Sequence, residues 1–587
     1  MKIAILSGKG GTGKTFVSVN LSYIQQDAVY LDCDVEVPNG HLYLPIENPV
    51  VEPVDMPIPS ILHEKCSRCR ACMNFCAFHA LSFTGKQILL FDHLCHNCGG
   101  CALVCPNKAI QEVPYNIGSI SSGNFEHVRV YSGSLNPGQM QGSAIIRRMI
   151  DQTRHLPNLV MDCSPGNSCH VVQGIVEADL CILVAEPTVF GVNDMRICID
   201  LLNTYNKPFG IVINKSLDTR NYIKTFCREH NIKVLAEIPL SPKLARINAS
   251  GQLAAKDAEY SRIFKKIPQK CAGSARSPLG VPSRFCSGQG GILMKQLLIL
   301  SGKGGTGKTT IASSFISLLK GQHKTCFADC DVDVPNLHLI FSEGQTMLSQ
   351  KTCFGKRAVI NQSLCTHCGL CEQHCRFGAM KNGVVNPYLC EGCGVCELVC
   401  PIGSGSEKAV HLAETSTGSY SVSATEYGVF STASLKPGAG ATGKTINMVK
   451  QNLSTYGENA EIAVIDGSPG IGCPIISSVA GVDLVLLVLE PSLSGLSDLT
   501  RILKTVRQLR VPAVACINRS DTAPQFTQDI YRYCAEHELM VLEEIPFDPL
   551  VIRAVNHNRP IVDYPNSPAA QRVTSLFSKT LEVLNTL

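Results

Sequence analysis

The 587-residue sequence predicts an α/β fold with two parallel-sheet domains, one in each half of the chain. The first observation is an internal duplication, because residues 7–15 (SGKGGTGKT) recur without change at 301–309. The second is a series of continuous apolar runs, such as LCILVAEP, that alternate with longer amphipathic segments. Runs of this kind are typical of strands that are buried on both faces of a parallel sheet. The third is a cysteine-rich block inserted into each half.

The duplication extends over nearly the whole chain. Residues 31–39 (LDCDVEVPN) correspond to 328–336 (ADCDVDVPN), and 160–169 (VMDCSPGNSC) correspond to 464–473 (VIDGSPGIGC). The segment between the halves is rich in Gly, Ser and Pro, which predicts a linker. We therefore expect a first sheet domain at 1–60 and 111–270, a first inserted domain at 61–110, the linker at 271–294, a second sheet domain at 295–355 and 411–587, and a second inserted domain at 356–410.

The repeated nine residues fit the phosphate-binding pattern G-x-x-x-x-G-K-[ST] between an apolar run and a helix-like segment. Glycines in such a loop let backbone N–H groups surround a polyphosphate, and the helix N-terminus adds its positive dipole end. We expect Lys14 and Lys308 to contact the β/γ-phosphates of ATP, and Thr15 and Thr309 to bind Mg²⁺. The other expected loop residues are Gly8, Lys9, Gly10, Gly11, Thr12 and Gly13, with Gly302, Lys303, Gly304, Gly305, Thr306 and Gly307.

Acidic residues end two of the predicted strands in each half. At the second strand they are Asp32, Asp34, Asp329 and Asp331. A carboxylate at that edge of a parallel sheet faces the nucleotide crevice, where it orients water or holds Mg²⁺. Asp162 and Asp466 end a later strand, directly before Ser-Pro-Gly, and suit a Mg²⁺ partner beside a loop that senses the γ-phosphate. The alternative for any one of these residues is a turn or helix cap.

Each cysteine-rich block carries two runs of the form C-x₂-C-x₂-C-x₃-C, which is the spacing of two-cluster bacterial ferredoxins. In that arrangement the fourth cysteine of each run binds the other cluster. The expected [4Fe–4S] ligand sets are Cys66, Cys69, Cys72 and Cys105; Cys95, Cys98, Cys101 and Cys76; Cys365, Cys368, Cys371 and Cys400; and Cys390, Cys393, Cys396 and Cys375. Zinc is the alternative, but zinc sites use ligands in two pairs, and these eightfold runs do not divide in that way. Ala77 and Arg376 stand where the usual first run of each block has Pro.

The composition limits the class of protein. A chain that is 45 % hydrophobic and 17 % charged is expected to fold into packed domains. Its net charge of +4 argues against a strongly basic nucleic-acid protein. The sequence has no run of 18 apolar residues, so no membrane span is predicted. The N-terminal residues lead directly into a strand rather than a signal peptide, so we expect a cytoplasmic protein. Thirty cysteines in that compartment favour metal or redox chemistry over disulfides.

The combined motifs resemble the MinD/ParA/Mrp class of deviant-Walker ATPases, which also includes the iron protein of nitrogenase. The resemblance rests on the phosphate loops with a second lysine (Lys9, Lys303), the Asp-x-Asp-Val-x-Val-Pro-Asn segments and the Asp-x-Ser-Pro-Gly segments. The inserted blocks resemble one branch, the MinD-superfamily ATPases with an inserted ferredoxin domain. The chain looks like a tandem fusion of two such copies.

This resemblance implies a nucleotide-sandwich pair within one chain. In the family the second lysine reaches the partner's phosphates, so Lys9 would serve the second half and Lys303 the first. Asp34 and Asp331 match the family's water-activating aspartate, and Asn214 and Asn518 match its adenine-contacting asparagine.

Cys169 and Cys473 lie seven residues after Asp162 and Asp466, where the iron protein of nitrogenase has a cluster-binding cysteine. The second ligand of that protein has no counterpart here, since 118–150 and 418–450 contain no cysteine. A small buried thiol is therefore one interpretation of each residue, and a cluster or metal between the halves is the other.

The expected function is ATP hydrolysis that controls electron transfer through four [4Fe–4S] clusters to a redox partner protein. One alternative is an assembly or insertion ATPase that delivers a cluster to an apo-metalloprotein. A second alternative is a positioning or partition ATPase, for which no basic DNA patch or membrane helix is evident.

Overall fold

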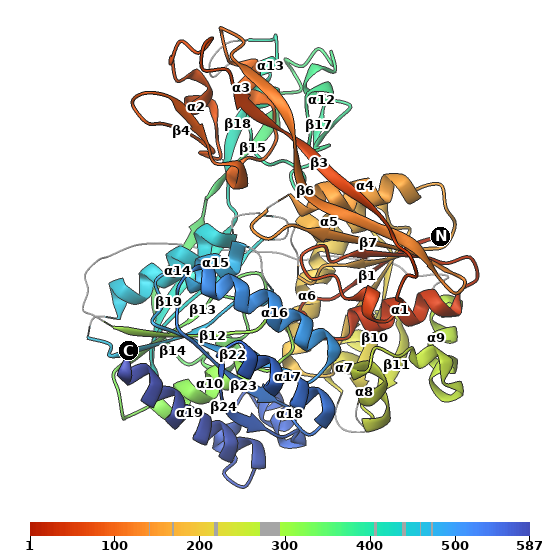
Figure 1. Ribbon diagram of the computed structural model, residues 1–587, viewed down its shortest axis with the longest axis vertical. Helices are drawn as coiled ribbons and strands as arrows, with labels where there is room; N and C mark the ends of the chain where they lie inside the picture. The colour runs from red at the N-terminus through yellow and green to blue at the C-terminus, as the bar shows by residue number, and fades with distance from the viewer. Residues whose placement is uncertain are drawn as a thin grey trace.

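The computed structural model describes residues 1–139, 141–166, 169–216, 221–270, 294–403, 408–436, 439, 442–457, 459–470 and 473–587. The predicted linker at 271–294 therefore lies outside the described residues except for Met294. Two α/β domains lie side by side, and two small cysteine-containing modules sit together at one end of the molecule (Figure 1).

Each half contains a nine-stranded sheet, and the two sheets have equivalent strand orders. The first has the order β11-β10-β9-β1-β8-β2-β7-β6-β3, in which all neighbours from β11 to β7 are parallel. Its strands are β1 (Lys2–Leu6), β2 (Val29–Cys33), β3 (Val50–Ile61), β6 (Ile110–Phe125), β7 (Val128–Leu135), β8 (Leu159–Cys163), β9 (Leu180–Ala185), β10 (Phe209–Ser216) and β11 (Val234–Pro239). The second has the order β14-β19-β20-β13-β21-β12-β22-β23-β24 and comprises β12 (Lys295–Leu300), β13 (Thr325–Asp329), β14 (Gly344–Thr352), β19 (Gly418–Thr425), β20 (Gly428–Leu435), β21 (Ile462–Asp466), β22 (Leu484–Leu489), β23 (Ala513–Asn518) and β24 (Met540–Ile545).

Helices cover both faces of each sheet, because successive strand residues point to opposite faces and both faces are apolar. In β1, Ala4 and Leu6 belong to one core, and Ile3 and Ile5 belong to the other. The helices of the first half are α1 (Lys14–Ile24), α4 (Gly142–Thr153), α5 (Cys169–Glu177), α6 (Val189–Thr204), α7 (Tyr222–Glu229), α8 (Pro242–Ala249) and α9 (Ala258–Lys270), with 3₁₀ turns η1 (Gly40–Leu42) and η3 (Ala254–Lys256). Those of the second half are α10 (Lys308–Leu319), α11 (Leu337–Ile340), α14 (Thr442–Tyr456), α15 (Cys473–Val479), α16 (Leu493–Gln508), α17 (Pro524–Glu536), α18 (Pro549–Asn556) and α19 (Pro568–Thr586), with η5 (Ile561–Asp563). The predicted pair of parallel-sheet α/β domains is confirmed.

The edge of each sheet that leads to the cysteine module is antiparallel, which the apolar runs did not predict. β3 pairs with β6 from Val50↔Ser122 to Ile61↔Ile110, so a two-stranded arm joins the first sheet to its module. In the second half β14 pairs with β19, and a separate pair, β15 (Gly355–Ile360) and β18 (Val410–Thr415), continues toward the module. Each predicted boundary of an inserted domain lies inside one of these strands.

We call residues 61–110 and 356–410 the first and second cysteine modules. Each holds two short helices and a two-stranded ribbon around a small core that includes several cysteines. The first contains α2 (Ala71–Phe75), α3 (Gly100–Leu103), β4 (Leu81–Phe83), β5 (Ile88–Leu90) and η2 (Asp92–Leu94), and the second contains α12 (Leu370–Gln373), α13 (Val395–Val399), β16 (Met380–Lys381) and β17 (Val384–Val385). Among the described residues, none of the helices combines the length and the apolar character of a membrane span.

Candidate nucleotide site between the two halves

The phosphate-binding loops connect β1 to α1 and β12 to α10, as the motif predicts. Gly13 and Gly307 precede these helices with φ of 94° and 102°, a conformation that glycine adopts readily and other residues do not. The structure therefore places the predicted loop residues, from Gly8 to Thr15 and from Gly302 to Thr309, in the expected strand–loop–helix arrangement.

The two loops touch each other across the boundary between the halves. A methyl group added to Gly10 would lie 2.9 Å from the Gly304 Cα, and one added to Gly304 would lie 2.6 Å from the Gly10 Cα. These distances are shorter than packed carbon atoms allow. No side chain fits between the loops, so the duplicated glycines are what permits this contact.

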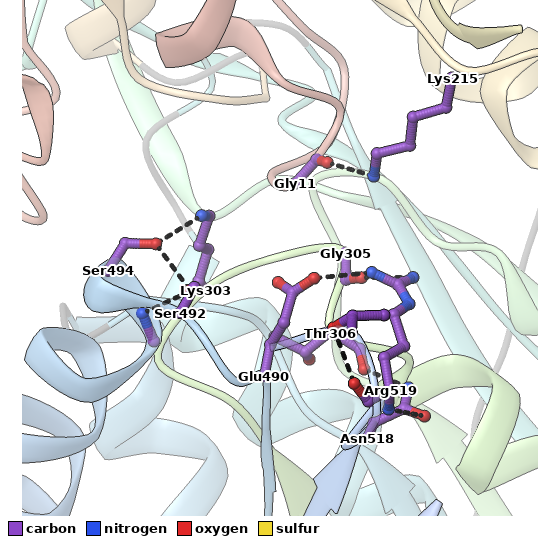
Figure 2. Close-up of polar contacts among 12 residues, drawn as sticks. Gly11, Lys215, Lys303, Gly305, Thr306, Glu490, Ser492, Ser494, Asn518 and Arg519 are labelled. Atoms are coloured by element: carbon purple, nitrogen blue, oxygen red, sulfur yellow. Dashed lines mark hydrogen bonds and ion pairs between the residues drawn. The ribbon is translucent and has the colours of Figure 1, made fainter. Parts of the chain in front are cut away.

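Asn214 and Asn518 brace the loops from the side. The Asn214 Nδ2 donates to the Thr12 carbonyl at 2.7 Å. The Asn518 Nδ2 donates to the Thr306 carbonyl at the same distance (Figure 2). The resemblance implied an adenine contact for both residues, and that assignment stays a prediction.

A basic residue after each asparagine also holds a loop, and the sequence analysis missed it. The Lys215 Nζ donates to the Gly11 carbonyl at 2.9 Å. In the second half Arg519 donates to the Gly305 carbonyl at 3.2 Å and pairs with Glu490 at 2.8 Å (Figure 2). The signal was present, because a basic residue follows the asparagine in both IVINKS and VACINRS.

The predicted phosphate and magnesium residues meet acidic partners. The Lys14 Nζ lies 2.6 Å from Asp162 Oδ1 and 3.8 Å from Asp34 Oδ2. Burial acts to lower the pKa of Lys14, but these carboxylates outweigh burial and raise it above its ordinary value. In the second half the Thr309 hydroxyl donates to Asp466 Oδ2 at 2.6 Å. Burial lowers the pKa of Lys308, the counterpart of Lys14, despite the neighbouring Asp466.

The second lysine of each loop behaves differently in the two halves. The Lys9 Nζ crosses the boundary and lies 3.1 Å from Asp331 Oδ2. The Lys303 Nζ donates to the Ser494 hydroxyl of its own half at 3.1 Å (Figure 2). Asp194, which the sequence analysis did not select, faces Lys9 and receives a 2.9 Å hydrogen bond from Asn336 of the other half.

The paired aspartates after β2 and β13 have separate roles. Asp32 accepts a 2.7 Å hydrogen bond from the Gly40 backbone N–H, and Asp329 accepts bonds from the N–H groups of Asn336 and Leu337. These two carboxylates therefore hold the loop that follows. Asp34 instead lines the cavity described next, where burial and neighbouring carboxylates raise its pKa to about 7 although Lys14 opposes the shift.

A cavity of about 600 Å³ lies between the halves. Both phosphate-binding loops, both Ser-Pro-Gly loops, Asp34 and Asp331 line it. Within the described part of the chain, the buried hydroxyls of Thr12 and Thr306 have no hydrogen-bond partner. Buried polar groups are normally paired, so these loop hydroxyls, beside N–H groups at two helix N-termini, fit the oxygens of a polyphosphate.

The cysteines of the first module gather in the two predicted sets. Cys66, Cys69, Cys72 and Cys105 surround one small cavity, and Cys76, Cys95, Cys98 and Cys101 surround a second. The described residues contain no group of three or more His, Cys, Asp or Glu that could hold a single metal ion. A four-iron cluster occupies more space than one ion, and thiols spaced around a cavity fit the larger group.

The second module groups its cysteines in a similar way. Cys375 and Cys390 lie close to Cys396, and Cys365 and Cys368 lie close to Cys371. These neighbours belong to the same predicted sets, except that Cys371 also lies near Cys396.

Cys169 and Cys473 are the first residues of α5 and α15, and their side chains lie outside the described residues. The next residue in the first half, His170, lines the cavity between the halves and is 7 % exposed. Its Nδ1 lies 3.7 Å from Glu36 Oε1, and its Nε2 has no hydrogen-bond partner among the residues that the structure describes.

A family model provides the identification. The model of the CobQ/CobB/MinD/ParA nucleotide binding domain matches residues 3–254 and, separately, residues 297–561. The chain belongs to this family. It contains two copies of the MinD/ParA-type P-loop domain, as the duplicated motifs predicted.

Relatives of this MinD/ParA-type chain include two proteins of an archaeon. The uncharacterized protein MJ0578 of Methanocaldococcus jannaschii is 32 % identical over 297 residues, which cover 50 % of this chain and 99 % of that protein. The uncharacterized ATP-binding protein MJ0547 of the same organism is 25 % identical over 288 residues, 49 % of this chain and 87 % of its own. Among solved structures, the cell division ATPase MinD of Pyrococcus furiosus is 18 % identical and covers 50 % of this chain and all of its own, with a TM-score of 0.32.

The raised pKa of Asp34 predicts a pH-dependent stability. The folded protein keeps this carboxyl protonated up to about pH 7, whereas the unfolded chain ionises it near 3.8. The stability that this proton contributes is therefore complete below the unfolded pKa and is lost as the pH rises toward 7. Asp34→Asn should raise the thermal unfolding midpoint at about pH 8 and change it little at about pH 3.5, below the unfolded pKa.

The control is Asp151→Asn, which alters a carboxylate that is 54 % exposed and should show no such difference between the two pH values. Equal effects of Asp34→Asn at both pH values would show that this carboxyl is ionised throughout.

Proposed function

We propose that the protein is a magnesium-dependent ATPase whose nucleotide cycle controls electron transfer through iron–sulfur clusters in the two cysteine modules. The observation that carries this proposal is the shared cavity, into which both phosphate-binding loops face and across which Lys9 contacts Asp331. A polyphosphate bound there would contact both halves at once, so its binding energy would favour the closed pair over an open one.

The residues of each site divide the work of hydrolysis. Lys14 and Lys308 neutralise charge on the β- and γ-phosphates, and Thr15 and Thr309 hold Mg²⁺ with support from Asp162 and Asp466. Asp34 and Asp331 orient the attacking water. Lys9 adds positive charge to the second site from the opposite half, and Lys303, which bonds Ser494 of its own half in this structure, would turn toward the first site when ATP binds, so that each site is complete only when the halves meet.

The cysteine modules would carry the electron transfer that the nucleotide cycle controls. Clusters bound there would provide one-electron transfer at potentials set by the surrounding charges and hydrogen bonds. Support comes from the two cavities of the first module, each lined by one complete set of four predicted ligands. The partners would be a one-electron donor and a redox acceptor protein in the cytoplasm.

Single-site variants test the reciprocal use of the second lysines. Lys14→Ala should inactivate the first site and leave the second site competent for hydrolysis. Lys308→Ala should inactivate the second site and leave the first site competent. Adding Lys9→Ala should lower ATP hydrolysis by about 100-fold in the Lys14→Ala protein and much less in the Lys308→Ala protein, because Lys9 serves the second site. Lys303→Ala should give the opposite pattern. If Lys9→Ala and Lys303→Ala each lower hydrolysis only at the site of their own half, the proposed dependence of each site on the opposite half is wrong.

Iron and sulfide analysis of the full chain tests the electron-transfer part. Anaerobic reconstitution should give four [4Fe–4S] clusters, and Cys72→Ser should remove about one quarter of the iron. Cys516→Ser is the control, since this cysteine is buried in β23 away from both modules. Incorporation of zinc with no cluster absorbance would contradict the proposal.

A second candidate function is the insertion of a metal or metallocluster into another protein. The observation that favours it is the buried His170, which follows Cys169 beside the shared cavity and whose Nε2 has no hydrogen-bond partner within the described part of the chain. Imidazole and thiolate are common ligands of transition metals. His170→Ala and Cys169→Ser should then reduce iron transfer to an apo-acceptor while the iron of the modules is unchanged. The exposed-loop variant His127→Ala is the control. Transfer that is unaffected by these changes would leave only the electron-transfer function.

A further inference from the structure

The two cysteine modules contact each other, although they belong to different halves of the chain (Figure 1). The Cys98 and Cys393 side chains lie close to each other across this contact. The His96 Nδ1 lies 3.5 Å from Glu391 Oε2 beside them. The contact therefore joins the inner ligand set of the first module (Cys76, Cys95, Cys98, Cys101) to the inner set of the second (Cys375, Cys390, Cys393, Cys396).

Arg376 crosses this contact from the second module to the first. It follows Cys375, at the position where the usual cysteine run has Pro. Its two terminal nitrogens each lie 2.7 Å from one carboxylate oxygen of Glu112 in the other half. Nη1 also donates to the Asn97 carbonyl at 3.1 Å, and a methyl group on Gly99 would lie 2.8 Å from Nη2. The guanidinium is thus fixed against the Cys95–Cys101 loop of the first module.

The position of the ion pair bears on function as well as on stability. Arg376 and Glu112 are 35 % and 28 % exposed, so solvent screens the pair only in part, and its bidentate geometry can stabilise the contact between the modules. Glu112, however, lines the cavity of the inner ligand set in the first module. Without Arg376 its negative charge would stand uncompensated beside that cavity.

The duplication does not repeat this pair. Ala77 stands where Arg376 stands in the second module, and Leu412 stands where Glu112 stands in the first. In the first module, the inner ligand set therefore has a carboxylate on its cavity wall, together with a cation from the opposite half that neutralises it.

Helix α4 of the first sheet domain holds both sides of the contact. Arg147 donates from Nη1 to the Arg376 carbonyl at 2.8 Å and from Nη2 to the Phe377 carbonyl at 3.3 Å. At the start of the same helix, the Gln141 side chain donates to the Cys95 carbonyl. Gly142 packs against the His170 ring, in which Nε2 would lie 2.9 Å from an added methyl group. His170 is the second residue of α5, which follows the Ser-Pro-Gly loop of the nucleotide site.

We propose that Arg376 is a positioning residue through which the second half sets the charge beside the inner ligand set of the first module, and that α4 links its position to the nucleotide site. This inference rests on the proposed function. Uptake of one electron from a one-electron donor adds negative charge at that set, with no bond made or broken. A nearby uncompensated carboxylate opposes this uptake, and the paired guanidinium removes the opposition.

A double-mutant cycle on the reconstituted full chain tests the charge effect. Redox titration followed by electron paramagnetic resonance should show that Arg376→Gln lowers one of the four midpoint potentials and leaves the others in place. Glu112→Gln should raise the same potential, because the positive charge of Arg376 is then no longer offset by a carboxylate. The double variant should return close to the wild-type value. The control is Lys381→Gln, an exposed cation of the same module that should shift nothing.

Opposite shifts cannot arise from a merely loosened contact, so shifts of the same sign in both single variants would overturn the proposal. Arg376→Lys keeps the charge and should restore most of the potential. In protein prepared without iron, Arg376→Gln should also increase deuterium uptake across residues 95–101, where the guanidinium is bound.

The link to the nucleotide site has its own measurement. A non-hydrolysable ATP analogue with Mg²⁺ should shift the same midpoint potential in the wild-type protein and not in Arg376→Gln or Arg147→Gln. A nucleotide shift that persists in both variants would exclude this route. If the protein contains four clusters and Arg376→Gln shifts no midpoint potential, the role proposed for Arg376 is wrong while the proposed function stands. If the protein binds no clusters, the proposed function itself is wrong.

Discussion

The contact between the two phosphate-binding loops is the constraint on which the rest of the structure depends. Gly10 and Gly304 bring their backbones together, and with them two helix N-termini and the lysines of both loops. Such a concentration of positive charge is unfavourable unless anions compensate it. Here Asp162 holds Lys14 and Asp331 holds Lys9 across the boundary. A bound polyphosphate would compete with these carboxylates for the same cations, so nucleotide binding and the contact between the halves cannot be independent.

Much of this site could be predicted from local sequence. The loops, the aspartates after β2 and β13, and the two sheets follow from short motifs and apolar runs whose structure depends on neighbouring residues. The roles of Lys215 and Arg519 were missed because a single basic residue after a strand has no distinctive pattern, although its recurrence in both halves was visible. The antiparallel arms were missed for a similar reason, since β3 contains three prolines and lacks the continuous apolar character of the central strands.

Long-range contacts could not be predicted in this way. The bonds from Arg376 to Glu112 join residues 264 positions apart, and nothing in the cysteine spacing indicates which half an arginine will face. The sequence did show that Arg376 replaces the usual Pro. Only the packing of the two modules shows why an extended, charged side chain is useful there. Departures from a repeat or a motif are therefore informative after the fold is known, because they mark where two similar halves have acquired different tasks.

Tandem fusion makes such differences possible. In a pair of identical chains, a residue placed on one side of the contact appears on the other side as well. In this chain Arg376 and Glu112 occupy one side alone, Lys9 crosses the boundary while Lys303 contacts its own half, and His170 has Pro474 as its counterpart. The two halves share a fold and a nucleotide-binding motif, yet they surround the shared cavity and the module contact with different charges. An asymmetric pair of this kind places different charges on the two sides of the contact, which a pair of identical chains cannot do.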